Sequence, residues 1–380
     1  MRRSQIRTVG LLAFLAALLL QPITAHAVTF QEIARFDVAG SSDVNGGSYI
    51  GNNPSAVAWN GRQLYIAGFN SSGGTADTAI VEVTNALSTG LQVATLGPAF
   101  GALSTPNLRG YSGLDLGIYA NSGLPGLTAA YDDGAADPNG IQLFDASSNL
   151  LVWTKNARGG SGVTFDPGFP GGDPAFGEGV AWTTFGSGRR ALQDDATGAD
   201  IWTTSNGMIF TAGASTFNRD MDFDPDTGDI YVRAANDLTK ATRTGDNSVS
   251  GPSNIVNNAA NAPFVNGQNL SFLSNTVVGD LLVYNDRAAT GSAPFSAVVK
   301  AVDTSGAALP LSFALIGGGS PADGIGYYDF DFDPTTQTLA LMDFANRNVH
   351  IFQVAPEPSS VGLALLGGIA ALARRRELQH

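Results

Sequence analysis

The chain has 380 residues, with 47 glycines, 18 prolines, three histidines and no cysteine. The lack of cysteine excludes disulfides and thiolate metal sites, and three histidines are too few for a multi-histidine zinc or iron site. Lys and Arg number 20 against 33 Asp and Glu, so the net charge is −13. Nucleic acid is therefore not an expected partner, because neutralising phosphates needs a basic footprint.

Residues 1–27 have the three parts of a secretory signal peptide. Three arginines precede an apolar run at 9–20, and the segment ends in Ala-His-Ala. The run is too short to span a bilayer stably, and small residues at Ala25 and Ala27 match a signal peptidase site. We expect Sec-type machinery to export the chain and cleavage to follow Ala27.

Residues 28–355 form the predicted body. This segment is rich in Asp, Asn and Gly, which favour turns, and poor in Glu, Lys and Gln, which favour helices. Apolar residues make up 43% of the chain, which is enough to build a core. The composition predicts an all-β body with many turns.

Two similar segments predict β-hairpins in this body. DMDFDPDTG at 220–228 returns as DFDFDPTTQ at 329–337, and an apolar run follows each segment. Both read as a strand, an Asp-Pro turn and a second strand. A third hairpin is predicted at 56–66, where Asn60-Gly61 is a strong turn signal.

A second repeated element sets the length of the repeating unit. The pattern of a strand, an Asp-containing turn and a second strand begins near 143, 195 and 302. The first spacing corresponds to one repeating unit and the second to two, so the unit is about 50 to 60 residues long. The sequence therefore predicts a β-propeller of about six four-stranded blades, with 33–38 completing the last blade beside 349–352. One or two β-sandwich domains remain the alternative. The blades resemble those of quinoprotein-like propellers, a likeness of architecture that implies no cofactor.

The segment 356–380 has a second tripartite pattern. Pro356-Glu357-Pro358 comes first, an apolar stretch at 361–373 follows, and Arg374, Arg375 and Arg376 come next. The apolar stretch predicts a short membrane helix, and the arginines should remain on the cytoplasmic side. Such a helix would anchor the exported body at the inner membrane.

This order of motifs resembles the PEP-CTERM sorting signal of Gram-negative bacteria. The resemblance covers only the last 25 residues or so, and the chain departs from it in a short helix and in four residues after the arginines. It implies recognition by exosortase, a membrane-embedded cysteine protease. It also implies transient anchoring, followed by delivery to the cell surface or to the extracellular matrix, with extracellular polysaccharide as a partner.

Alternating carboxylates make Asp222, Asp224 and Asp226 candidate calcium ligands, since Ca²⁺ prefers hard oxygen ligands. The spacing departs from a calcium loop, because Gly228 stands one position late and no Glu closes the loop. Alternation along a strand also fits ordinary outward solvation of these carboxylates. No metal and no cofactor is assigned.

The sequence contains candidate catalytic and sugar-binding residues but no complete catalytic motif. The carboxylates at 132–133, 178 and 194–195 could pair for glycoside hydrolysis, but their separation depends on the fold. His350 lies in an apolar strand pattern and is expected to be structural. The tryptophans are expected in the core before any sugar-binding role; they are Trp59, Trp153, Trp182 and Trp202.

The sequence therefore favours an exported surface or matrix protein with a non-catalytic binding or structural role. Two alternatives stay open. One is an extracellular propeller hydrolase or lyase, with calcium as a possible requirement, and the other is a carbohydrate-binding adhesin. Calcium-dependent stability that Asp222→Ala abolishes would favour the first alternative, and binding to matrix glycan without a calcium response would favour the second.

Overall fold

The fold was taken from a computed structural model. It describes residues 27–38, 54–68, 79–101, 103, 110–118, 123–132, 139–156, 159–173, 178–184, 190–193, 197–200, 218–234, 237–257, 269–286, 298–318, 328–344 and 346–356. Regular structure in these ranges is almost entirely β. No helix within them is long and apolar enough to cross a membrane, and the predicted helix at 361–373 lies outside them.

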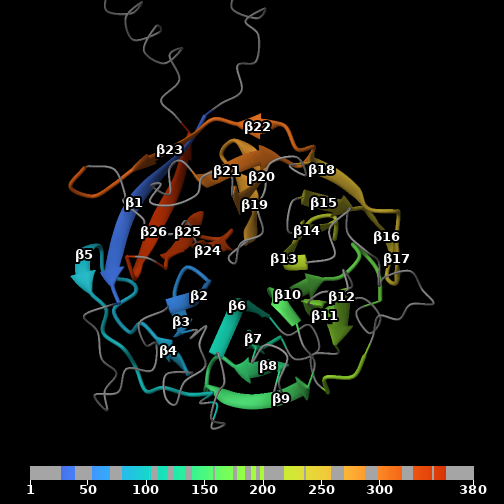
Figure 1. The fold of residues 1–380 in the computed structure, drawn as a ribbon, viewed down its shortest axis with the longest axis horizontal. Helices are drawn as coiled ribbons and strands as arrows, with labels where there is room; N and C mark the ends of the chain where they lie inside the picture. Colours follow the sequence, from blue (N-terminus) through green and yellow to red (C-terminus); the bar gives the residue numbers. More distant parts are fainter. Residues whose placement is uncertain are drawn as a thin grey trace, which may run out of the picture.

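The strands form separate sheets that are arranged around a common centre (Figure 1). The first three sheets along the chain contain β2 (Pro54–Trp59), β3 (Leu64–Gly68) and β4 (Ile80–Glu82); β6 (Gly110–Ile118), β7 (Pro125–Asp132), β8 (Gly140–Asp145) and β9 (Leu150–Asn156); and β10 (Gly159–Pro167), β11 (Glu178–Thr184) and β12 (Arg190–Gln193).

Three further sheets complete the ring. They contain β13 (Asn218–Phe223), β14 (Ile230–Ala234), β15 (Asp237–Ala241) and β18 (Ser253–Asn257); β19 (Leu270–Thr276), β20 (Gly279–Asn285), β21 (Val299–Asp303) and β22 (Ala308–Leu309); and β24 (Tyr328–Asp333), β25 (Thr338–Asp343), β26 (Asn348–Pro356), β1 (Val28–Asp37) and β23 (Leu311–Ala314), with β5 (Gly90–Val93) beside β1. A separate hairpin is formed by β16 (Arg243–Gly245) and β17 (Ser248–Val249).

The N-terminal strand closes the ring, as the sequence predicted. Strand β1 pairs antiparallel with β26, so that Ala34 lies opposite Ile351 and Phe36 lies opposite Val349. The first and last strands of the body thus belong to one sheet, which joins the two ends of the body by backbone hydrogen bonds. Radial closure of this kind protects sheet edges from pairing with other chains.

The three predicted hairpins are confirmed. Strands β13 and β14 pair Phe223 with Ile230, and strands β24 and β25 pair Asp333 with Thr338. The Asn-Gly turn joins β2 to β3, where Trp59 lies opposite Leu64. Local turn chemistry favours these hairpins, because Asp-Pro and Asn-Gly supply turn conformations and side-chain acceptors for the turn backbone.

The body is all-β and propeller-like, and the predicted class is confirmed. Among the described residues, the sheets β2–β4 and β10–β12 have three strands each, and the other sheets of the ring have at least four. The predicted strand near 201–203 lies outside the described ranges.

Apolar side chains fill the spaces between neighbouring sheets. One cluster joins Tyr65 of β3 to Tyr111 of β6 and Phe144 of β8, and all three side chains are buried. Burial of each large apolar side chain contributes about 1.5–3 kcal/mol, so these contacts hold adjacent sheets together. The centre of the ring, by contrast, is lined with carboxylates.

Candidate functional site

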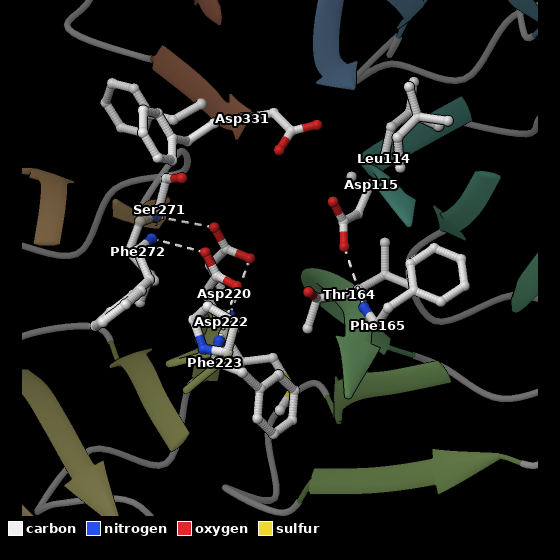
Figure 2. A pocket seen from close by; sticks show the side chains of 18 of the residues that line it. Leu114, Asp115, Thr164, Phe165, Asp220, Asp222, Phe223, Ser271, Phe272 and Asp331 are labelled. Carbon is white, nitrogen blue, oxygen red and sulfur yellow. Dashed lines mark hydrogen bonds between the residues drawn. The ribbon is translucent and has the colours of Figure 1, made fainter. Parts of the chain in front are cut away.

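The innermost strands enclose a pocket of about 180 Å³ at the centre of the ring (Figure 2). The strands that line it are β6, β10, β13, β19 and β24. Its carboxylates among the described residues are Asp115, Asp220, Asp222, Asp329 and Asp331. Phe165, Phe223, Phe272, Phe330 and Phe332 also line it, as do Pro167, Pro225 and Pro334.

Strand alternation brings the carboxylates to the centre. In β13, Asp220 and Asp222 direct carboxylates toward the pocket, while Met221, which also lines it, packs in an apolar cluster with residues of β14. Figure 2 shows Asp115, Asp222 and Asp331 pointing toward one space from different strands. The expectation that Asp222 is solvated on an outer face is therefore wrong, because the polar face of this strand is the face that lines the pocket.

The carboxylates of three inner strands, β6, β13 and β24, join each of these strands to a neighbouring sheet. Asp220 Oδ2 accepts a hydrogen bond from the backbone N–H of Leu270 at 2.8 Å, and Asp222 Oδ2 accepts one from Phe272 at 2.7 Å. Both donors belong to β19, which lies in a different sheet from β13. The side chains thus provide hydrogen bonds where no backbone ladder connects the two strands.

The same arrangement recurs at two other boundaries between sheets. Asp329 Oδ2 accepts from Val57 N at 2.8 Å and Asp331 Oδ2 accepts from Trp59 N at 2.5 Å, which joins β24 to β2. Asp115 Oδ2 accepts from the backbone N–H of Phe165 at 3.1 Å, which joins β6 to β10. We call these contacts the carboxylate staples. Their main consequence is structural, because each satisfies a buried backbone donor.

Burial raises the pKa of every stapling carboxyl group. It raises the pKa of Asp222 to about 6, that of Asp329 to about 7 and, with a contribution from Asp222, that of Asp115 to about 8. The pKa values of Asp220 and Asp331 lie well above the usual range, first because of burial and then because other carboxylates are near. Proton uptake at the centre of the ring is thus expected near neutral pH.

The calcium candidates do not converge. Asp222 lines the pocket, whereas Asp224 Oδ1 accepts from the backbone N–H groups of Asp226 and Thr227 and so stabilises the turn. Asp226 Oδ2 accepts from Asn275 Nδ2 at 3.2 Å, at an exposed position. Among the residues that the structure describes, no three His, Cys, Asp or Glu side chains are grouped so that they could hold a metal ion.

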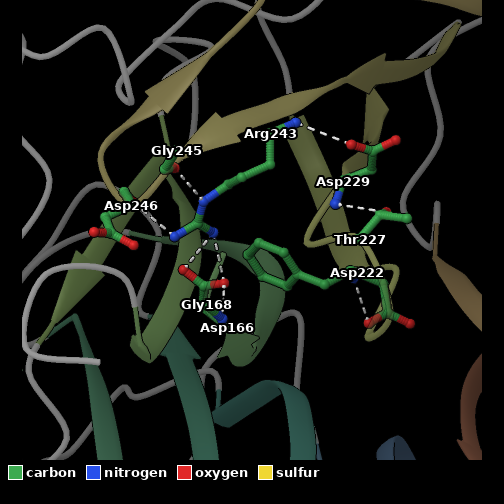
Figure 3. Close-up of polar contacts among 9 residues, drawn as sticks. Asp166, Gly168, Asp222, Thr227, Asp229, Arg243, Gly245 and Asp246 are labelled. Carbon is green, nitrogen blue, oxygen red and sulfur yellow. Dashed lines mark hydrogen bonds and ion pairs between the residues drawn. The ribbon is translucent and has the colours of Figure 1, made fainter. Parts of the chain in front are cut away.

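A second polar cluster supports β13 and β14 from outside the pocket (Figure 3). Arg243 Nη1 contacts both carboxylate oxygens of Asp166 at 2.7 and 2.8 Å, and both side chains are fully buried. Arg243 also donates its backbone N–H to Asp229, at the start of β14. The pair ties the β16–β17 hairpin to the end of β10, and its role is structural.

Other predicted residues are structural or lie outside the described part. His350 is buried, and its Nδ1 lies 2.7 Å from Oε1 of Glu32, a residue of β1. Trp59, Trp153 and Trp182 are buried as expected. The set outside the described side chains comprises Asp132, Asp133, Glu178, Asp194, Asp195, Trp202, Ala25, the sorting motif Pro356, Glu357 and Pro358, and Arg374, Arg375 and Arg376.

Asp115 is the pocket residue that the sequence reasoning missed. It is a single Asp between Leu114 and Leu116 and belongs to no repeated motif. The available signal was a carboxylate inside an otherwise apolar strand, which is costly unless the group is hydrogen-bonded or protonated.

Comparison with known proteins identifies the fold alone. No family profile matches the chain, and no curated protein is significantly similar to it. An auxiliary nutrient binding protein from Bacteroides ovatus is similar in structure, with a TM-score of 0.54, 12% identity and coverage of 87% of this chain and 77% of that one. An auxiliary nutrient binding protein from Bacteroides thetaiotaomicron gives a TM-score of 0.51 at 10% identity, over 86% of this chain and 76% of that one.

Proposed function

We propose that this is an exported bacterial surface or matrix protein with a non-catalytic binding role, and that a small polar ligand, or the end of a larger one, enters the central pocket. The observation that carries the binding role is the central pocket of about 180 Å³, and the carboxylate staples that line it favour a non-catalytic role. Each pocket carboxylate accepts a backbone hydrogen bond from a neighbouring strand, which is a structural role. A general acid or base must instead exchange protons with a substrate.

Two of the structural neighbours, the auxiliary nutrient binding proteins, support the same reading. Both are described as auxiliary nutrient binding proteins, and neither description names a catalytic activity. Similar folds host unrelated functions, so the names add support only beside the geometry of the pocket. The blade count of about six is part of this proposal, and the spacing of roughly 50 to 60 residues between innermost strands supports it.

Export and sorting are the second part of the proposal. The signal peptide at 1–27 and the PEP-CTERM pattern at 356–380 support Sec-type export, exosortase processing and release near extracellular polysaccharide. The pairing of β1 with β26 adds a physical argument, because Val28 lies opposite Pro356. Cleavage after residue 27 and near residue 356 would leave every described strand in place.

The intact mass of protein recovered from the surface and the medium of the native host tests the sorting. We expect a chain that begins at Val28 and ends between Pro356 and Pro358, with any excess mass due to a transferred anchor or to glycosylation. A recovered chain that still ends at His380 would contradict processing by a sorting protease.

A ligand screen tests the binding role. We expect one member of a panel of sugars, amino acids and matrix polysaccharide fragments to raise the thermal midpoint of the mature protein. Asp222→Asn should weaken that shift. Asp280→Asn is a matched control, since Asp280 accepts a backbone N–H of Asn275 outside the pocket. Product release from any panel member, lost in Asp222→Asn, would overturn the non-catalytic role in favour of a hydrolase or lyase.

A further inference from the structure

A second cavity lies between two neighbouring sheets, away from the centre of the ring. It has a volume of about 480 Å³ and is lined by the β2–β3 turn, the end of β4 and the segment that follows it, the first residue of β7, Pro125, and Ser147 of the β8–β9 turn. It shares no lining residue with the central pocket. We call it the rim cavity, and its occupant is independent of the function proposed for the centre.

Two side chains of opposite charge line the rim cavity without pairing to each other. Arg62 comes from the β2–β3 turn, and Glu82 is the last residue of β4. Neither side chain forms an ion pair within the described part of the chain. Burial raises the pKa of Glu82, and no hydrogen bond opposes that rise. A partly buried carboxylate without donors is unfavourable, and a cationic group placed beside it would relieve the cost.

The polar wall of the rim cavity is held in place by hydrogen bonds. Gln63 Nε2 donates to Tyr65 Oη at 3.0 Å and to the carbonyl of Ala146 at 3.2 Å. Asn85 Nδ2 donates to Gln92 Oε1 at 2.9 Å. A wall that is fixed before a ligand arrives lowers the entropic cost of binding.

Apolar side chains also line the cavity. Leu87 lines the cavity and is 68% exposed, and Pro125 lies on the side of the neighbouring sheet. An exposed leucine in a concave site can bury its surface against an apolar part of a ligand. The cavity therefore offers one anionic group, one cationic group and one apolar contact.

We propose that the rim cavity binds a small zwitterion, an α-amino acid or the terminus of a short peptide. The ligand ammonium lies at Glu82, its carboxylate lies at Arg62 and an apolar side chain lies against Leu87. Arginine suits a carboxylate because its planar guanidinium can donate two parallel hydrogen bonds. A neutral sugar fits less well, since it would leave both charges without a counter-charge.

Isothermal titration of the full chain at pH 7 tests this proposal with leucine, N-acetyl-leucine, leucinamide and a neutral disaccharide as probes. We expect leucine to bind, and expect the two blocked derivatives to bind at least tenfold more weakly because each lacks one charge. Binding of the disaccharide without binding of leucine would overturn the proposal, as would equal binding of leucine and both derivatives.

Two substitutions test which side chain binds each charged group of the ligand. Arg62→Gln should abolish the preference for leucine over leucinamide, and Glu82→Gln should abolish the preference for leucine over N-acetyl-leucine. Lys300→Gln is the matched control, because Lys300 carries a charge on β21 outside the cavity. Thermal midpoints equal to that of the parent confirm that the variants fold. Unchanged preferences in both cavity variants would contradict the proposal. Asp222→Asn changes the central pocket alone, so it should leave leucine binding intact whichever ligand the central pocket binds.

Discussion

The hairpins β13–β14 and β24–β25 share a sequence pattern at their inner end and differ at their outer turn. In both, the first two carboxylates of the pattern staple the strand to the next sheet, Asp220 and Asp222 in one and Asp329 and Asp331 in the other. At the outer turn the left-handed position is Gly228 in the first hairpin, with φ +73°, and Gln337 in the second, with φ +57°.

The surroundings of the two turns explain this difference. A Cβ at position 228 would lie 2.5 Å from the carbonyl oxygen of Gly168, so only glycine fits there. Gln337 instead uses its side chain, donating from Nε2 to the carbonyl of Pro334 at 2.9 Å. The Asp residues at the inner end are thus determined by the hydrogen bonds between sheets. The residue at the left-handed turn position is determined by the segment that packs against the turn.

The largest effect is expected from removing the ion pair between Asp166 and Arg243, which supports the β13–β14 hairpin. Asp166→Ala leaves Arg243 buried without its carboxylate, and we expect the free energy of unfolding to fall by about 3–5 kcal/mol. Urea denaturation of the variant and the parent measures this loss. The double variant Asp166→Leu with Arg243→Met should recover most of the stability, and a loss as large in the double variant would contradict this explanation.

Local patterns were sufficient to predict the hairpins and the ring closure, but they could not orient the strands. The alternation of Asp222 with Phe223 indicates two faces, and only the packed ring decides that the acidic face lines the centre. Asp115 has no repeat partner, so its position at the pocket depends on contacts between β6 and β10. Glu82 of the rim cavity lies opposite Tyr65 through the pairing of β3 with β4, and Arg62 belongs to the turn before β3, an arrangement that no local motif signals.

The second prediction contrasts the two turns directly. Gly228→Ala places a side chain at a left-handed φ and against the Gly168 carbonyl, and we expect a loss of about 2 kcal/mol or more. Gln337→Ala keeps the backbone of a non-glycine residue and loses side-chain hydrogen bonds, so a loss of about 1 kcal/mol or less is expected. Urea midpoints of the two variants measure the difference. Equal losses would show that the close contact at 228 does not determine the turn.

The smallest expected effect concerns the staples and pH. Because burial raises the pKa of Asp222 to about 6, the folded state holds this proton more tightly than the unfolded state does. The contribution to stability is therefore complete below the unfolded pKa near 4 and is lost as pH rises toward 6. Charges that face Asp222 at the pocket are those of Asp115, Asp220 and Asp331, and their ionisation adds to the loss.

Asp222→Asn removes this titration and keeps an oxygen that can accept from Phe272. As pH rises from 4 to 6, the variant should gain stability relative to the parent. We expect the thermal midpoint of the variant minus that of the parent to increase by about 2 °C over this range. Asp331→Asn, the equivalent change in the second hairpin, should extend the gain to higher pH, because its pKa lies further above the usual range. A difference that stays constant across pH 4 to 8 in both variants would mean that the staples remain ionised throughout, and the two hairpins would then differ only at their turns.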